Sequence, residues 1–254
     1  MFLILKVKRG YRYIRLVETI RKVCTPIINS WLQSSVVLHD VLHGFIQGGR
    51  TGTAIIEAKL DQQIAGIVHE PLFQVFIDVR KAYNSLYRVR CMEILREYGL
   101  GPRLQKSIQC YWDRQRVVTK AGNYYGRPFS TGRGVTQGEL VSPALFNIMV
   151  DSVFRATLQD ICGPQEAQHY FGWSEGEHNI CFYADDGRIA GRYPIWVQTA
   201  LTTILRMFER VGLQTNLNKT KAMVCTPGFI WVQQGAESYN DKPPGTDQPF
   251  GKGR

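Results

Sequence analysis

The 254-residue sequence lacks the features that would place it outside the cell or in a membrane. Its six cysteines include no C-x-x-C pair, and their wide scatter argues against both a disulfide framework and a zinc ribbon. No stretch reaches about 18 apolar residues, so we expect no membrane span. The short apolar start, MFLILKV, lacks the length and the cleavage site of a secretory signal. These absences predict an intracellular protein with reduced, mostly buried thiols, and they do not distinguish nucleus from cytoplasm.

Acidic residues are few relative to basic ones. The chain holds 31 Lys and Arg against 21 Asp and Glu, which gives a formal net charge of +10. An excess of this size suits a polyanionic partner, because each neutralised phosphate releases condensed counterions. An ordinary basic protein is the alternative on charge alone. The basic segments 88–90 and 114–120 are the candidates for tracking a nucleic-acid backbone, although charged helix faces are often only solvated.

The spacing of apolar residues predicts a mixture of helices and strands. Helices are predicted at residues 17–33, with a kink or a division at Pro26, and at 54–67, 82–98, 104–114, 142–158 and 195–212. Strands are predicted at residues 1–7, 72–79, 117–121, 124–129 and 213–224, with a tight hairpin at 180–189. This order is typical of an α+β fold, an antiparallel sheet backed by helices on one face.

Three aspartates are notable because they interrupt apolar strand patterns. Asp78 lies in the run 76–79, and Asp185 and Asp186 lie at the tip of the 180–189 hairpin. A charged side chain among apolar strand residues is costly unless it is paired or holds a cation. Clustered carboxylates suit Mg²⁺ or Mn²⁺, and two ions about 3.5–4 Å apart would serve an in-line phosphoryl displacement. Each aspartate alone also fits an ordinary strand-end cap or turn.

Together with their flanking residues, the aspartates resemble the ordered motifs of reverse transcriptases of the non-LTR retrotransposon and group II intron type. Residues 76–83 (FIDVRKAY) resemble motif A, 134–147 (GVTQGELVSPALFN) motif B, 183–186 (YADD) motif C and 212–220 motif D. Residues 11–16 and 44–51 are similar to two motifs of the fingers. The similarity covers roughly residues 10–225, and several motifs in one order are more specific than any single motif.

The resemblance implies the right-hand polymerase fold, with a palm and partial fingers. It assigns residues 1–70 to the fingers and 71–225 to the palm, with a fingers-side hairpin insertion at about 115–133. Residues 226–254 lose periodicity and collect Gly, Pro and polar residues, so we expect them to be mostly disordered. No helical thumb is recognisable in that segment, and we expect the thumb to be missing.

The resemblance also implies the catalytic residues. Asp78, Asp185 and Asp186 would be the metal ligands, with two Mg²⁺ as cofactors and Mn²⁺ as a substitute. Lys219 would protonate or stabilise the departing pyrophosphate, although exposed lysines are usually only solvated.

The residues implied to bind substrate come from three of the motifs. Tyr83 resembles the aromatic steric gate that crowds a ribose 2′-hydroxyl, and a core aromatic is about equally consistent with its pattern. Gln137 and Gly138 would lie against the template and the nascent base pair, or form a plain loop before a helix. Arg12 would grip the triphosphate, and Lys81 would contact phosphate or begin a helix as a solvated side chain.

The activity implied is that of an RNA-directed DNA polymerase, a nucleotidyltransferase. It would extend a DNA or RNA primer with deoxynucleoside triphosphates on an RNA template. Ile46 stands where the family usually has Arg, and Asn84 where Asp is common, and such losses of polar contacts weaken nucleotide binding. Two alternatives therefore stay open: a catalytically silent retroelement remnant that binds nucleic acid, and an RNA-templated RNA polymerase. The sequence does not indicate an oligomeric state.

Overall fold

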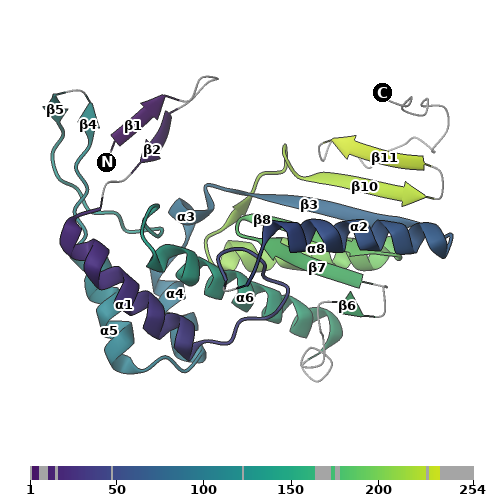
Figure 1. The fold of residues 1–254 in the computed structure, drawn as a ribbon, viewed down its shortest axis with the longest axis horizontal. Coiled ribbons are helices and arrows are strands. Elements are labelled where there is room, and N and C mark those ends of the chain that lie inside the picture. Colours follow the sequence, from purple (N-terminus) through teal and green to yellow (C-terminus); the bar gives the residue numbers. More distant parts are fainter. Residues whose placement is uncertain are drawn as a thin grey trace.

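The computed structural model describes the backbone of residues 2–5, 11–14, 17–46, 48–121, 123–163, 173–174, 178–226 and 229–234. Side chains are described for residues 17–46, 48–120, 123–163 and 179–226. Within these ranges the fold is a central antiparallel sheet with helices packed against it, and a small second sheet beside it (Figure 1). The α+β class predicted from the sequence is confirmed.

The central sheet contains seven strands in the described part of the chain. Its order is β11-β10-β3-β8-β7-β6, and β9 pairs with the far end of β3. The strands are β3 (Leu72–Arg80), β6 (Trp173–Ser174), β7 (His178–Tyr183), β8 (Asp186–Gly191), β9 (Gln214–Thr215), β10 (Lys221–Thr226) and β11 (Phe229–Gln234). The neighbours pair antiparallel throughout. The sheet therefore places β3, which carries Asp78, directly beside the β7–β8 hairpin, which carries Asp185 and Asp186.

The two faces of this sheet have different coverings. Because side chains alternate along a strand, Ile77 and its odd-numbered neighbours in β3 face the main core, while Gln74, Phe76 and Asp78 face the other side. The core face packs against α8 (Pro194–Arg210), which in turn packs on α6 (Val141–Cys162). Figure 1 shows α8 behind the sheet.

Helix α2 (Thr51–Ile67) crosses the opposite face of the sheet (Figure 1). It packs on the end of the sheet where Ala65 contacts Leu72 and Ala190. Phe76, nearer to Asp78, is 37% exposed. Helices therefore cover both faces of the sheet, and α2 covers only part of the second face. The part of that face around Asp78 is open to solvent.

The remaining elements surround α6 and form the second sheet. The helices are α1 (Thr19–Ser35), α3 (Ala82–Ser85), α4 (Arg88–Glu97) and α5 (Pro102–Asp113). The second sheet has the order β2-β1-β4-β5, formed by β1 (Phe2–Leu5), β2 (Tyr11–Ile14), β4 (Lys120–Ala121) and β5 (Tyr124–Tyr125). Pro26 lies inside α1, which continues as one helix, so the division considered from the sequence does not occur.

The structure corrects two further expectations about the elements. The helix predicted at 82–98 is two helices, because residues 86–87 leave helical geometry to bond with neighbouring backbone: the Tyr87 amide donates to the carbonyl of Val211, and the Leu86 carbonyl accepts from Gly134. Strand β11 lies inside the segment 226–254 that we expected to be mostly disordered, and residues 227–228 and 235–254 lie outside the described residues.

The thiols are less buried than expected. No disulfide joins the six cysteines, all of which lie in the described residues; only Cys91 and Cys181 are buried, while Cys24 and Cys110 are exposed. Burial raises the pKa of Cys91 to about 12 and that of Cys181 to about 11, so these two stay protonated near neutral pH.

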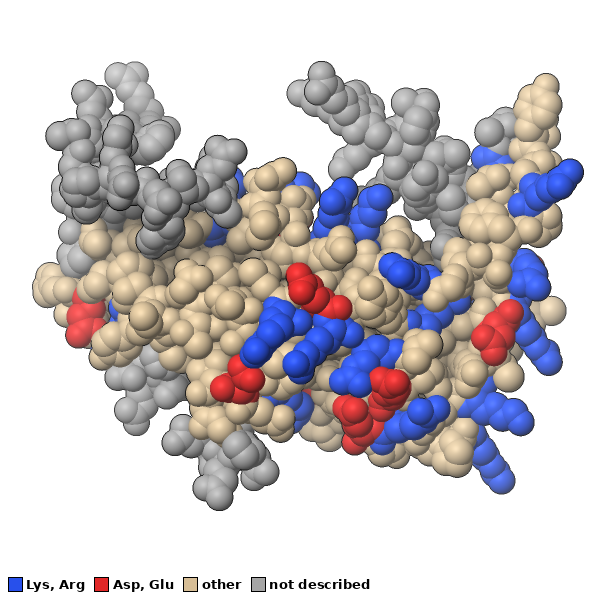
Figure 2. Space-filling view, turned by 180° about the vertical axis from the view of Figure 1, so that it is seen from behind, with Lys and Arg blue, Asp and Glu red and all other residues tan. Residues whose placement is uncertain are grey.

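The face seen from behind carries charges of both signs. Figure 2 shows Lys and Arg side chains over the centre of this face, with Asp and Glu side chains among them. Elsewhere, Arg206 of α8 forms an ion pair with Asp160 of α6 at 2.5 Å. Among the described residues, no helix has the length and apolarity that crossing a membrane requires.

Candidate active site

The register of the sheet places Asp78 beside the acidic hairpin. Asp78 in β3 pairs with Asp186, the first residue of β8. Residues directly opposite one another in antiparallel strands project from the same face, so both carboxylates lie on the open face. Asp185 precedes Asp186 in the two-residue turn that follows Tyr183. The structure therefore brings together the three aspartates that the sequence singled out.

The turn that carries Asp185 has an unusual backbone. Ala184 has a φ of 55°, in the left-handed region, which costs a residue with a Cβ atom about 1–2 kcal/mol. On one side, the amide of Val79 donates to the Asp185 carbonyl at 3.3 Å. On the other, a Cβ atom built on Gly44 would lie only 2.5 Å from the Ala184 nitrogen. Such a conformation persists where the surroundings over-determine it, so the turn is held from both sides.

The carboxylates influence one another electrostatically. The pKa of Asp186 is raised above its usual range, mainly by partial burial and then by the charges of Asp185 and Asp78. Lys219 opposes this shift. Since like charges disfavour the ionised form, the second and third causes amount to repulsion of the Asp186 carboxylate by those of Asp185 and Asp78.

The segment after β9 brings Lys219 to this cluster. The amide of Asn216 donates to the Asp78 carbonyl at 2.7 Å, and the amides of Lys219 and Thr220 donate to the Asn216 carbonyl at 2.9 Å. The Lys219 ammonium then lies 3.3 Å from Asp78 Oδ1. Because the Lys219 side chain is 67% exposed, this pair contributes little to stability. The sequence predicted a site role for Lys219 but not its contact with Asp78.

The three aspartates have the ligand chemistry that suits a divalent metal. Carboxylate oxygens are the ligands that Mg²⁺ and Mn²⁺ prefer, and mutual repulsion of the carboxylates favours a cation between them. In the described part of the chain, however, no three Asp, Glu, His or Cys side chains are placed to hold one ion together.

Tyr83 lies next to the acidic cluster. Its ring stacks on Phe146 of α6, with centroids 4.9 Å apart and planes at 18°. Burial raises the pKa of the Tyr83 hydroxyl to about 12, with the charge of Asp185 as the second cause. The hydroxyl therefore stays protonated near neutral pH. The Tyr83 ring packs on the core through Phe146 and lies close enough to Asp185 to feel its charge.

The loop before α6 is fixed to the residues around Tyr83. The amide of Val135 donates to the Tyr83 carbonyl at 2.7 Å, and the amide of Gly134 donates to the Leu86 carbonyl at 2.8 Å. Gly134 has a φ of 75°, and a Cβ atom there would lie 2.6 Å from the Tyr83 carbonyl oxygen. Only glycine meets both conditions at this position.

Arg88 strengthens the same loop, a role that the sequence did not reveal. Its Nε donates to the Gly134 carbonyl at 2.9 Å, its Nη1 to the Thr131 carbonyl at 2.5 Å, and its Nη2 to Gln115 Oε1 at 2.8 Å. The segment 88–90 was a candidate for tracking a nucleic-acid backbone. The structure instead directs Arg88 into the protein, and Arg90 pairs with Glu93 at 2.7 Å.

The other predicted substrate residues are less constrained. Gln137 and Gly138 follow the fixed part of the loop and are exposed, and Gly138 has a φ of 93°. Lys81 is exposed and precedes α3 with a φ of 49°. Arg12 belongs to β2, and its side chain lies outside the described residues. The substrate roles of these four residues stay predictions.

The chain is similar to polyproteins of R2 retrotransposable elements. It is 24% identical over 229 residues to the retrovirus-related Pol polyprotein from type-1 retrotransposable element R2 of Popillia japonica, which covers 88% of this chain and 31% of the relative. It is 27% identical over 143 residues to the polyprotein from type-2 retrotransposable element R2DM of Drosophila melanogaster, which covers 56% of this chain and 13% of the relative. The chain thus spans less than a third of the length of these relatives.

Solved structures of telomerase from Candida tropicalis share the fold. The apo form truncated from its C-terminal domain gives a TM-score of 0.54 at 12% identity, over 87% of this chain and 41% of that one. The form in complex with a TWJ fragment of telomeric RNA gives a TM-score of 0.56 at 12% identity, over 91% and 39%. Identities this low show similarity of the fold alone.

The family profile described as reverse transcriptase (RNA-dependent DNA polymerase) matches residues 4–244. The match includes the three aspartates, Tyr83, the loop before α6 and Lys219. It agrees with the polymerase fold and with the similarity to R2 polyproteins. The chain therefore belongs to the reverse transcriptase (RNA-dependent DNA polymerase) family.

Proposed function

We propose that this chain carries the polymerase centre of an RNA-directed DNA polymerase. It would add deoxynucleotides to the 3′-hydroxyl of a DNA or RNA primer on an RNA template. The observation that carries the proposal is the register of Asp78 with Asp186, beside a turn that holds Asp185 in place. Family membership supports the same reaction.

The proposed chemistry is a phosphoryl transfer assisted by two Mg²⁺ ions, with Mn²⁺ as a possible substitute. Asp78, Asp185 and Asp186 would hold the ions with their carboxylate oxygens. When bound, such ions lower the pKa of the attacking hydroxyl and neutralise charge on the triphosphate. Lys219 holds a proton at Nζ, 3.3 Å from Asp78 Oδ1, where it would neutralise or protonate the departing pyrophosphate.

The proposed substrate contacts involve five further residues. The Tyr83 ring, backed by Phe146, would crowd a ribose 2′-hydroxyl and so favour deoxynucleotides. Gln137 and Gly138 would face the template and the nascent pair, and Lys81 and Arg12 would contact phosphate. The net charge of +10 supports RNA and DNA as partners, and one telomerase of the same fold was solved with RNA.

Primer extension on an RNA template tests the proposal, with Asp185→Asn beside Asp113→Asn as a matched control. Both aspartates are exposed, and Asp113 lies at the end of α5. We expect extension by the wild type and by Asp113→Asn, and none by Asp185→Asn, because the amide cannot replace a metal-binding carboxylate.

Equal signals from wild type and Asp185→Asn would contradict this function and leave the silent, nucleic-acid-binding alternative. Ribonucleotides supplied beside deoxynucleotides in the same assay test the RNA polymerase alternative. We expect deoxynucleotides to be preferred, and a preference for ribonucleotides would contradict the proposal.

A further inference from the structure

We propose that Asn147 and Gly44 form a strut that positions the Tyr183–Asp186 turn for catalysis. In this strut, Asn147 is a positioning residue, because it acts on the aspartates through the backbone of Gly44. The inference rests on the polymerase function proposed above. Three sets of contacts support it.

The first set joins the segment before Gly44 to the catalytic hairpin. Leu42 forms a parallel bridge with Phe182 in β7. The amide of His43 donates to the Phe182 carbonyl at 2.8 Å, and the amide of Phe182 donates to the Val41 carbonyl at 2.8 Å. Residues 41–43 therefore extend the sheet at the end of β7 that leads into the turn.

The second contact lies between Gly44 and the turn itself. A Cβ atom on Gly44 would lie 2.5 Å from the Ala184 nitrogen and 3.2 Å from the Tyr183 carbonyl carbon. Both neighbours are backbone atoms, which have no flexible side chain to move aside. Glycine thus lets the two backbones touch at the residue with positive φ that precedes Asp185.

The third contact holds Gly44 from behind. Asn147 Nδ2 donates to the Gly44 carbonyl at 2.7 Å, and Asn147 is only 2% exposed. Asn147 lies on α6 between Phe146 and Ile148, both buried in the main core. The strut therefore connects the turn to the most deeply buried helix of the fold.

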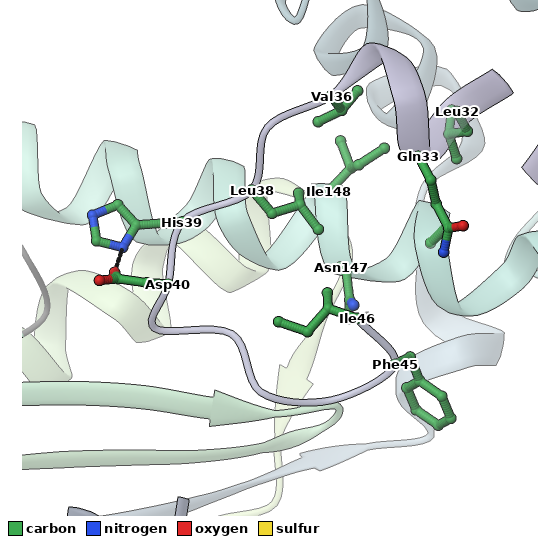
Figure 3. A pocket seen from close by; sticks show the side chains of 11 residues that line it. Leu32, Gln33, Val36, Leu38, His39, Asp40, Phe45, Ile46, Asn147 and Ile148 are labelled. Carbon is green, nitrogen blue, oxygen red and sulfur yellow. Dashed lines mark ion pairs between the residues drawn. The ribbon is translucent and has the colours of Figure 1, made fainter. Parts of the chain in front are cut away.

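A cavity explains why this hydrogen bond is needed. A space of about 300 Å³ lies between the end of α1, the segment 36–46 and α6. Figure 3 shows Asn147 reaching the loop beside Ile46, with Leu38 and Ile148 lining the space above them. Side chains that line a space lack packing partners on that side, so the bond from Asn147 adds a directed contact that packing does not supply there.

The decisive variant is Asn147→Leu, which keeps the approximate volume and removes the donor. Its matched control is Tyr98→Phe, because the Tyr98 hydroxyl donates to Asp151 at 2.5 Å, one helical turn further along α6. Each variant loses one hydrogen bond that involves a buried side chain of α6. Only Asn147→Leu removes the bond to Gly44. A purely structural role would lower stability in both and change catalysis in neither.

Steady-state primer extension gives the first measurement. We expect Asn147→Leu to lower kcat roughly ten- to a hundredfold with KM for the deoxynucleotide little changed, since small misplacements of reacting groups cost about that much. Tyr98→Phe should keep the wild-type kcat. Equal kcat values for the two variants would overturn the inference.

Amide hydrogen exchange gives a measurement that does not depend on activity. The amides of Phe182 and Val79, which bond to Val41 and Asp185, should exchange faster in Asn147→Leu and at the wild-type rate in Tyr98→Phe. Unchanged exchange at both amides overturns the strut. If the wild type does not extend primers, the proposed function fails, and exchange alone decides the inference.

Gly44→Ala tests the strut without removing a buried hydrogen bond, in case Asn147→Leu fails to fold. Its control is Gly66→Ala, at a position in α2 where nothing lies within 4 Å of the added Cβ. We expect Gly44→Ala to lower kcat and Gly66→Ala to leave it unchanged. Wild-type kcat in Gly44→Ala would overturn the proposal.

Discussion

The Lys219 ammonium lies 3.3 Å from Asp78 Oδ1, but the exposure of the pair decides how much it contributes to stability. The pair is exposed and would barely stabilise the fold. Yet three backbone hydrogen bonds, from Asn216, Lys219 and Thr220, build the turn that delivers the ammonium to the acidic cluster. At the scale of the residue, the stability of the pair therefore does not explain the geometry.

This leads to a prediction for Lys219→Met, with Lys221→Met as its control. Both lysines are exposed, and they are two residues apart. We expect Lys219→Met to slow nucleotide incorporation roughly a hundredfold, the usual loss when a positioned proton donor is removed. Lys221→Met should incorporate nucleotides at the wild-type rate. Single-turnover incorporation measures the effect, and equal rates in the two variants would argue that Lys219 is only a solvated lysine.

At the scale of the element, side chains from two other parts of the chain support the loop before α6. Arg88 on α4 reaches two of its carbonyls, and Gln115 links Arg88 to Thr136. The loop then presents Gln137 and Gly138 to solvent. A rigid base under an exposed tip is the arrangement expected of a loop that must meet a substrate in one position.

We predict that Arg88→Ala destabilises the fold far more than Arg90→Ala. Removing Arg88 leaves the loop carbonyls without their charged donor, which costs about 1.5–3 kcal/mol. Removing Arg90 breaks only its surface pair with Glu93, worth about 0–1 kcal/mol. The free energies of unfolding from urea titrations provide the comparison. Similar values for the two variants would show that Arg88 does not hold the loop.

Much of the element order could be predicted because it depends on local patterns. The apolar, β-rich run of β3, the acidic tip of the β7–β8 hairpin and the apolar face of α8 are all local patterns. The structure has these elements within a few residues of the predicted bounds. The break between α3 and α4 could not be predicted, because Leu86 and Tyr87 leave the helix to bond with partners far along the chain.

The same reasoning applies to the candidate site. Asp78, Asp185 and Asp186 could be found because charges interrupt apolar strands and match known motifs. The contacts of Arg88 and Asn147 were missed because an arginine in a basic segment and an asparagine in an apolar helix have many ordinary explanations. Only the positions of Gly134 and Gly44 in space show which carbonyls these side chains bind.

At the scale of the whole molecule, a buried network joins α2 to the central sheet. Arg188 of β8, only 5% exposed, donates from Nη1 to Asp61 of α2 at 2.6 Å, and from Nε and Nη2 to Gln74 of β3 at 2.9 and 2.7 Å. Asn179 of β7 adds a bond to Asp61 at 3.2 Å. The network lies on the same face as Asp186, two residues before Arg188, so it connects the helix that crosses this face to the strand that begins at the site.

We predict that Arg188→Met costs about 3–5 kcal/mol of stability, because it removes the buried cation that pairs with the Asp61 carboxylate. The double variant Asp61→Leu with Arg188→Met should recover most of this loss, since it removes both charges. Thermal or urea unfolding of wild type, single and double variants gives the values. A double variant as unstable as Arg188→Met would show that the pair is not the source of the cost.

The pairing of Asp78 with Asp186 also limits how this gene can change in length. Inserting one codon in β3 before Asp78 would turn its carboxylate toward the helix-packed core, because every following side chain changes face. Inserting two codons would keep the face and shift the carboxylate by ~7 Å along the strand. Substitutions in this strand are therefore milder than insertions or deletions. In related sequences, the number of residues between the positions of Leu72 and Asp78 therefore indicates whether the acidic cluster can assemble.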